Sequence, residues 1–137
     1  MSKKFIFATL SYVVLTLAIA YPWHFVWFKD LLDQLGMYNR AEPIIALGIL
    51  SMVIQGAVMA YLYPFYYKNG KPLVEGIKFG LIFGLFLFSV STLANAAKMN
   101  VSSITTFVEL QAAFHFIQFV ITGGAIGLIY GKLGSRD

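Results

Sequence analysis

Four long apolar stretches divide the chain, at residues 5–28, 43–67, 79–97 and 110–131. None of them contains a charged residue, and each approaches or exceeds the ~20 residues that a helix needs to cross the hydrocarbon core of a bilayer. A helix satisfies its backbone polar groups within the segment, which the bilayer interior requires. The pattern therefore predicts an all-α, single-domain membrane four-helix bundle over residues 1–137, with helices at about 5–28, 43–67, 73–97 and 107–131.

The first stretch also has features of a secretory signal peptide. Lys3 and Lys4 precede an apolar run that reaches Ala18 and Ala20, two small residues at the spacing of a cleavage site. The apolar run nevertheless continues as far as Phe28. We therefore expect a retained membrane helix.

The distribution of Lys and Arg around the stretches predicts the orientation of the chain. One side would carry Lys3, Lys4, Lys68, Lys71, Lys78, Lys132 and Arg136, whereas the other would carry Lys29, Arg40 and Lys98. Because cytoplasmic flanks are enriched in Lys and Arg, we expect both chain ends to lie in the cytoplasm. The segment 29–42 would then lie outside, where apolar residues at helical spacing predict a short helix on the membrane surface.

Residue types at two helix starts predict how those helices begin. Thr106 and Glu109 have the spacing of a capping box, with Thr106 as the N-cap. Glu42 precedes Pro43, and proline suits the first position of a helix. We therefore interpret both glutamates as groups that stabilise helix starts.

Two glycine series predict how the third and fourth helices pack. Glycines recur every four residues in each helix, at Gly76, Gly80 and Gly84 and at Gly123, Gly127 and Gly131. This spacing places small residues on one helix face, where two backbones can approach closely. We expect the two faces to meet in the cytoplasmic half of the bundle; docking of one face in an oligomer is the alternative.

The outer halves of these helices carry bulky aromatic residues instead, at Phe86, Phe88, Phe114, Phe116 and Phe119. Such side chains would hold the backbones apart, and Pro22 can bend the first helix near its outer end. We therefore expect a wedge-shaped cavity that opens toward the outer leaflet.

Polar residues within the predicted helices are candidates for a site in that cavity. The fourth helix carries Gln111, His115, Gln118 and Thr122 at spacings that place them on one face. The candidate lining residues of the cavity are His24, Gln55, Asn95, Gln111, His115 and Gln118. Polar residues inside a membrane are functional candidates by default, but hydrogen bonding between helices is the simpler interpretation of the same residues.

Composition narrows the chemistry further. The chain is 59% hydrophobic and 12% charged, with a mean hydropathy of +0.76 and no cysteine. The lack of cysteine excludes disulfides, thiolate zinc sites and iron–sulfur clusters, and the scattered basic residues do not indicate nucleic-acid binding. No motif of a known enzyme class is present, so we expect neither catalysis nor a cofactor. The alternative is a b-type haem with His24 and His115 as axial ligands.

Three segments resemble a family of small, uncharacterised four-span bacterial membrane proteins: Tyr-Pro-Trp-His-Phe at 21–25, Leu-Gly-Ile-Leu-Ser-Met-Val-Ile-Gln-Gly at 47–56 and Gly-Ile-Lys-Phe-Gly-Leu at 76–81. The resemblance implies a multi-pass protein of the bacterial cytoplasmic (inner) membrane and brings no activity with it. The sequence thus favours a non-enzymatic protein that binds a lipid or another hydrophobic ligand. The alternative is an accessory subunit of a larger membrane complex, or a homo-oligomer.

Overall fold

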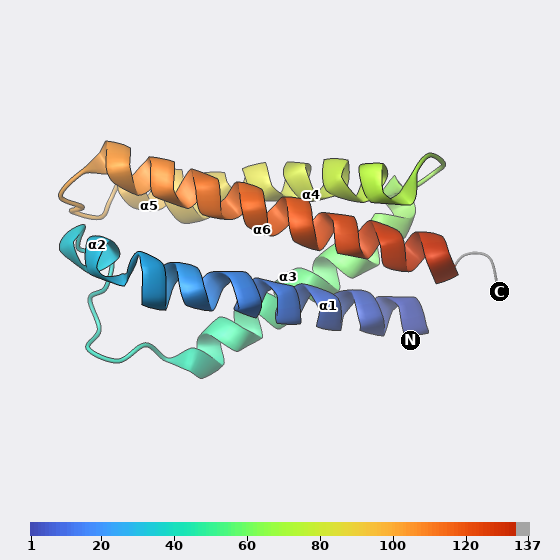
Figure 1. Ribbon diagram of the computed structural model, residues 1–137, viewed down its shortest axis with the longest axis horizontal. Helices are drawn as coiled ribbons and strands as arrows, with labels where there is room; N and C mark the ends of the chain where they lie inside the picture. Colours follow the sequence, from blue (N-terminus) through green and yellow to red (C-terminus); the bar gives the residue numbers. More distant parts are fainter. Residues whose placement is uncertain (134–137) are drawn as a thin grey trace.

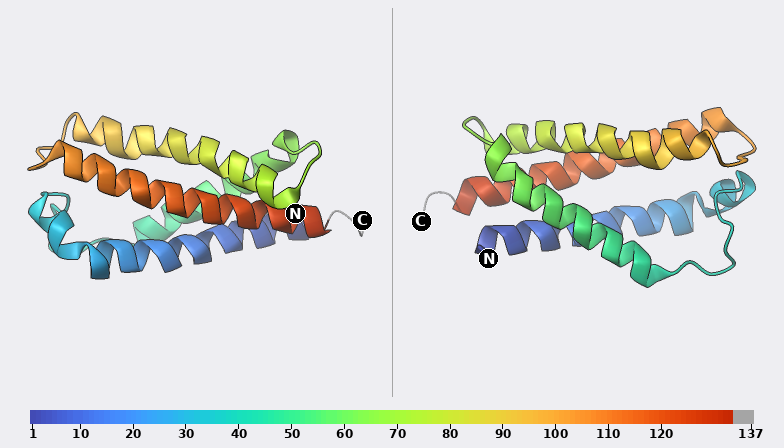
Figure 2. Two further views of the ribbon diagram at one scale, coloured as in Figure 1. Left: turned by 45° about the horizontal axis from the view of Figure 1, so that its top comes forward. Right: turned by 180° about the vertical axis from the view of Figure 1, so that it is seen from behind.

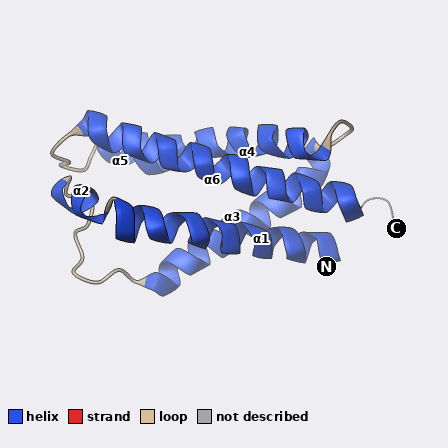
Figure 3. Cartoon of the chain, viewed as in Figure 1, coloured by secondary structure: helices blue, strands red, loops and turns tan. Residues whose placement is uncertain are grey.

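In the computed structural model, which describes residues 1–133, each of the four apolar stretches forms a long helix (Figures 1 and 3). All elements of the described residues are helical, and four helices are long and apolar enough to cross a membrane. This confirms the prediction of an all-helical chain with four membrane-spanning candidates. The elements are α1 (Lys3–Pro22), the π-helix η1 (Trp23–Trp27), α2 (Lys29–Gln34), α3 (Ile45–Tyr66), α4 (Pro72–Phe88), the π-helix η2 (Ser89–Leu93), α5 (Ala94–Ala96) and α6 (Ile104–Leu133).

The N-terminus and the turn at 67–71 lie at one end of the molecule, which we call the terminal end (Figure 1). The short helix α2 and the loop at 97–103 lie at the opposite end, which we call the α2 end. Arg136, which contributed to the predicted orientation, lies outside the described residues. The two ends therefore differ in basic residues as the sequence pattern indicates, with Lys3, Lys4, Lys68 and Lys71 at the terminal end.

Helices α4 and α6 run side by side along their whole length (Figures 1 and 2). Their glycines face each other: a Cβ atom on Gly76 would lie 2.8 Å from Gly127 Cα, and one on Gly123 would lie 2.7 Å from Gly80 Cα. Real Cβ contacts are longer than this, so only glycine permits such a close approach of the two backbones. Gly84 differs, because its neighbour is the ring of Phe119 rather than backbone.

The aromatic residues expected to hold these helices apart lie in different surroundings. Phe86 and Phe116 are more than half exposed, and Phe116 lines a groove between the two helices. Phe119 is buried, but the space left by Gly84 receives its ring. At Gly84, aromatic bulk therefore does not separate α4 from α6, because the glycine makes room for the Phe119 ring. The wedge-shaped cavity stays a prediction.

Helix α1 and the first half of α3 diverge from each other (Figure 2, right). The two helices approach closely at Gly56, where a Cβ atom would lie 3.0 Å from Tyr12 Cβ. Because α3 crosses α1 at an angle, its first turns diverge from α1 and are exposed on every side. The loop at 35–44 bridges the gap between them.

A buried cluster joins α1, α3, α4 and α6 nearer the terminal end. It consists of Ala8, Tyr12, Met59, Ala60, Tyr63, Phe79, Phe119 and Ile126. A second cluster at the α2 end consists of Leu32, Leu35, Val101 and Phe107. This second cluster fixes α2 to the loop at 97–103 and to the start of α6, and the Ser102 N–H completes the link by donating to Leu35 O at 3.1 Å.

Two helix starts differ from their predictions. Helix α6 begins at Ile104, and Ser103 rather than Thr106 acts at its start, because Ser103 Oγ accepts from the Thr106 N–H at 3.3 Å. The capping box with Glu109 is therefore wrong, since the helix begins a turn earlier. Helix α3 begins at Ile45, so Pro43 lies in the preceding loop and is not its first residue.

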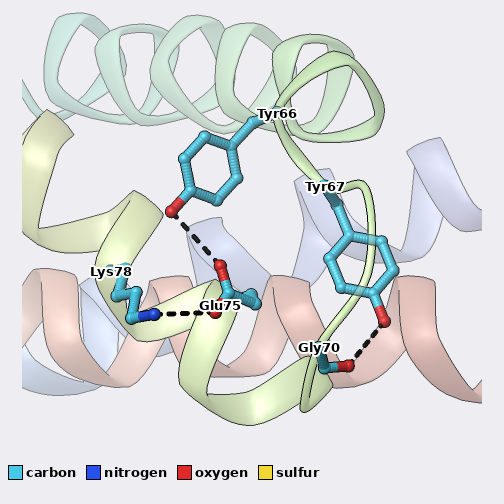
Figure 4. Close-up of polar contacts among 5 residues, drawn as sticks. All are labelled: Tyr66, Tyr67, Gly70, Glu75 and Lys78. Atoms are coloured by element: carbon cyan, nitrogen blue, oxygen red, sulfur yellow. Dashed lines mark hydrogen bonds and ion pairs between the residues drawn. The ribbon is translucent and has the colours of Figure 1, made fainter.

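The turn at the terminal end is held by side-chain contacts on both of its flanks (Figure 4). Tyr67 donates to Gly70 O at 3.0 Å, and Gly70 has a φ of +111°, which favours glycine. Lys78 pairs with Glu75 at 2.8 Å, and Tyr66 donates to the other carboxylate oxygen at 3.5 Å. Glu75 lies in the first turn of α4, where a carboxylate complements the helix dipole.

Candidate functional site

The polar face of α6 is buried over its whole length. Gln111, His115, Gln118 and Thr122 all have exposed fractions of 9% or less. Their common spacing places them on the side of α6 that packs against other helices, away from lipid. Each of them has a hydrogen-bond partner in the structure.

Gln118 belongs to a hydrogen-bond chain that links three helices. Its Nε2 donates to Tyr12 Oη at 3.2 Å and to Thr16 Oγ1 at 3.3 Å, both on α1. Tyr12 in turn donates to Gln55 Oε1 at 2.6 Å, and Gln55 Nε2 donates to Ser51 Oγ at 2.8 Å on α3. Gln55 and Gln118 thus tie α6 and α3 to α1, which corresponds to the simpler interpretation of these two residues.

His115 is a residue of α6, and its side chain contacts η2. Its Nδ1 lies 2.8 Å from Gln111 O, and its Nε2 lies 3.0 Å from Ser91 Oγ. A carbonyl oxygen can only accept, so Nδ1 carries the proton and Nε2 accepts from the Ser91 hydroxyl. The imidazole is thereby satisfied on both sides as a neutral group.

His24 lies within η1, close to the same part of α6. Its Nδ1 donates to Ala20 O at 3.0 Å, and its ring meets the ring of Phe114 edge-on with centroids 4.6 Å apart. Phe114 also contacts His115, with centroids 5.4 Å apart. The two imidazoles therefore share Phe114 as a neighbour, and a haem ligated by both would require this ring to move. The haem alternative stays a prediction.

Two π-helical segments, η1 and η2, occur in this region. η1 follows Pro22, which has no N–H to donate, and such interruptions of the hydrogen-bond ladder accompany π-bulges. In residues 1–133, buried polar atoms without a partner include Trp23 Nε1 in η1 and Thr92 Oγ1 in η2. Bulges of this kind are frequent at functional sites. The region of η1 and η2 is therefore one candidate functional site.

A large groove opens at the α2 end, between the end of α1 with η1, the loop at 35–44 and the start of α3. Its volume is about 1140 Å³. Aromatic and charged side chains form one part of it, and aliphatic side chains from the start of α3 form the other. The lining residues are Tyr21, Phe25, Lys29, Asp33, Met37, Tyr38, Asn39, Arg40, Ala41, Pro43, Ile44, Ile45 and Leu47. We call this the α1–α3 groove.

The α1–α3 groove crosses the boundary of the candidate membrane spans. Tyr21 and Phe25 lie near the end of the first span, and Ile45 begins the second. Lys29, Asp33 and Arg40 lie in the connecting segment outside both spans. One part of the groove is therefore suited to an apolar group within the membrane and the other to a polar group at its surface.

Tyr38 fixes the wall of the groove. Its hydroxyl donates to His24 O at 3.0 Å, and its ring stacks on Phe25 with centroids 6.2 Å apart and an interplanar angle of 18°. Partial burial, together with the Asp33 carboxylate, raises the pKa of Tyr38 above its usual value of 10.0. The phenol therefore stays protonated at neutral pH and keeps its hydrogen bond.

A smaller groove of about 300 Å³ lies between α4 and α6. Its lining is almost entirely apolar and includes Leu85, Phe116 and Phe119. Of the six predicted cavity-lining residues, His115 alone lies along it, and the Nε2 atom of His115 already accepts a hydrogen bond from Ser91. This groove offers an apolar surface and few polar contacts to orient a ligand.

The six predicted lining residues take part in several separate groups of contacts. Gln55 and Gln118 share the chain through Tyr12, and His24 and His115 share Phe114. Gln111 donates to Met37 Sδ at 3.4 Å, and Asn95 donates to Ser91 O at 2.7 Å within its own helical segment. None of the six lines the α1–α3 groove.

Sequence reasoning did not identify the residues that line this groove. Tyr21 entered only as part of the segment at 21–25, and Lys29 and Arg40 entered only the count of basic residues. One sequence pattern could have indicated the groove: aromatic and charged residues occur together around the long loop that connects the first two spans. The chain matches no family model, no curated protein and no solved structure with which it was compared.

Proposed function

We propose that this protein is a non-enzymatic membrane protein that holds a lipid or another hydrophobic ligand in the α1–α3 groove. The observation that carries the proposal is the position of the groove across the boundary between apolar span and polar connecting segment. An amphiphile in a bilayer has its own polar and apolar parts at the same depths. A groove with this division therefore suits such a ligand.

The aliphatic wall supports the proposal. Ile44, Ile45 and Leu47 are 46%, 57% and 59% exposed, and Ile45 and Leu47 lie within a candidate span. In a bilayer these side chains contact acyl chains. Ligand pockets are mostly apolar with a few polar groups that fix orientation, and Lys29, Asp33 and Arg40 supply the polar groups here.

Native mass spectrometry of the protein extracted in mild detergent tests this function. We expect the wild type to retain a lipid-sized adduct, and Leu47→Trp to lose it because the indole fills the groove. Ile49→Trp is the matched control, since Ile49 is 40% exposed on the same helix and does not line the groove. Loss of the adduct in both variants, or its absence from the wild type, would contradict the proposal.

We infer that the terminal end faces the cytoplasm and the α2 end faces outward. The support is the excess of Lys and Arg in the flanks at the terminal end. In this orientation the glycine contacts from Gly76 to Gly131 lie in the cytoplasmic half, and the α1–α3 groove opens to the outer leaflet. The bacterial cytoplasmic membrane is the proposed location.

A second candidate function is that of a subunit in a homo-oligomer or a larger membrane complex. The observation in its favour is the first half of α3, which diverges from α1 and makes few contacts with α4 and α6. Ile54 is 55% exposed there, and nothing within 4 Å surrounds the Cβ position of Gly48. A native mass above that of one chain, lost in Gly48→Trp, would support this function; a monomeric mass would contradict an oligomer.

A further inference from the structure

We infer that the ligand of the α1–α3 groove is a phospholipid whose headgroup carries both a phosphate and an ammonium group, as phosphatidylethanolamine does. This inference rests on the proposed function, because it names the class of lipid that the same groove would bind. It is carried by the charges that line the polar part of the groove and by the aromatic wall beside them.

Two cationic side chains in the groove are suited to bind the phosphate group. Lys29 begins α2, Arg40 lies in the loop at 35–44, and both line the groove. Both are exposed, and within residues 1–133 the structure shows no ion pair for either of them. Lys and Arg bind phosphate through charge-assisted hydrogen bonds, and the planar guanidinium can do so with two parallel bonds.

One carboxylate in the same groove argues against a purely anionic ligand. Asp33 lines the groove with Lys29 and Arg40 and forms an ion pair with neither. A second negative charge brought next to Asp33 would be repelled. A headgroup that also carries an ammonium group converts this repulsion into attraction, so the set of two cations and one anion matches a zwitterion.

The aromatic wall adds a second contact for an ammonium group. Phe25 lies between Tyr21 and Tyr38, with ring centroids 5.7 Å and 6.2 Å away respectively. Cations are attracted to the faces of aromatic rings, most strongly where water is partly excluded. The wall is fixed in place by the hydrogen bond from Tyr38 to His24 O.

The apolar part of the groove distinguishes a lipid from a free phosphate. Ile44, Ile45 and Leu47 continue the groove into the candidate span. The volume of about 1140 Å³ slightly exceeds the ~1000 Å³ that is the upper limit for small-molecule pockets. It accommodates a headgroup with the upper part of its acyl chains, whose remainder extends into the bilayer.

Lipid titrations followed by native mass spectrometry test the inference, with dioleoyl phosphatidylethanolamine, dioleoyl phosphatidylglycerol and oleic acid as probes. We expect wild type to prefer phosphatidylethanolamine over phosphatidylglycerol by about tenfold, as one charge-assisted contact would give. Asp33→Asn should abolish this preference, whereas Lys29→Gln combined with Arg40→Gln should weaken both phospholipids. Asp30→Asn and Lys98→Gln are the matched controls, because neither residue lines the groove.

The outcomes separate the inference from the function on which it rests. Equal retention of both phospholipids, or a preference that Asp33→Asn does not change, overturns the headgroup assignment and leaves lipid binding intact. Tighter binding of oleic acid than of either phospholipid also overturns it. Retention of none of the three probes by the wild type overturns the proposed function as well. Circular dichroism and size-exclusion profiles of the variants verify that these exposed substitutions leave the fold unchanged.

Discussion

Gln118 is the residue through which α6 is bonded to α1, and Tyr12 passes that connection on to α3. Hydrogen bonds between membrane helices contribute about 0.6 kcal/mol each on average. We expect Gln118→Leu to lower the free energy of unfolding by roughly 1–2 kcal/mol, because it removes two such bonds and leaves a polar group less well satisfied. Unfolding in mixed micelles measures the change.

A double-mutant cycle with Tyr12→Phe isolates the contact between these two side chains. The coupling should be about 0.6 kcal/mol, which corresponds to the bond from Gln118 Nε2 to Tyr12 Oη. Thr105→Val, at an exposed position of the same helix, controls for the loss of a polar group. Strictly additive effects of Gln118→Leu and Tyr12→Phe would show that the two side chains do not interact.

Tyr38 predicts a dependence of stability on alkaline pH. Its pKa is raised in the folded protein, so the unfolded chain loses this proton first as the pH rises past the usual value of 10.0. The contribution of Tyr38 to the free energy of unfolding is therefore fully present below that pH and declines above it. At neutral pH, Tyr38→Phe should cost ~1 kcal/mol through the lost bond to His24 O.

The measurement is the difference in unfolding free energy between wild type and Tyr38→Phe, followed from roughly pH 8 to 11. The difference should be constant at first and shrink at the alkaline end. Tyr21→Phe serves as the control, because Tyr21 lines the same groove and, within residues 1–133, its hydroxyl has no hydrogen bond in the structure. A difference that stays constant to the highest pH would contradict the role of the Tyr38 proton.

At the scale of the elements, the pairing of α4 with α6 depends on glycine at positions where the backbones touch. Gly80→Ala would place a methyl group against Phe119 O and 2.9 Å from Gly123 Cα. Forcing packed backbones apart should cost about 1–3 kcal/mol. Gly48→Ala is the matched control, since it makes the same change in a helix where nothing lies within 4 Å.

Both variants gain the same helix propensity, so the difference between them reports packing alone. We expect Gly48→Ala to be neutral or stabilising and Gly80→Ala to be destabilising in the same micelle assay. Equal effects would show that α4 and α6 separate without cost.

The sequence predicts those features that depend on neighbouring residues, and it does not predict those that depend on contacts between residues far apart in the chain. The four spans follow from local composition, and the burial of Gln111, His115, Gln118 and Thr122 accompanies their helical spacing. The α1–α3 groove does not follow from such patterns. It depends on the angle at which α3 crosses α1, and contacts far apart in the sequence, such as Gly56 with Tyr12, set that angle.

At the scale of the whole molecule, the asymmetry of basic residues predicts the side of the membrane that each end occupies. The chain contains no cysteine, so one introduced cysteine reports one position without background. Asn39→Cys and Asn100→Cys lie at the α2 end, and Asn69→Cys lies in the turn at the terminal end. All three positions are exposed.

In intact cells, a membrane-impermeant maleimide should label the cysteines at positions 39 and 100, and it should label position 69 only after the membrane is permeabilised. The reason is that the Lys and Arg of the terminal end are retained in the cytoplasm during insertion. Labelling of position 69 alone in intact cells would reverse the orientation and would move the α1–α3 groove to the inner leaflet. The lipid chemistry inferred from Lys29, Asp33 and Arg40 does not depend on the side, so the headgroup titrations would keep their meaning in either orientation.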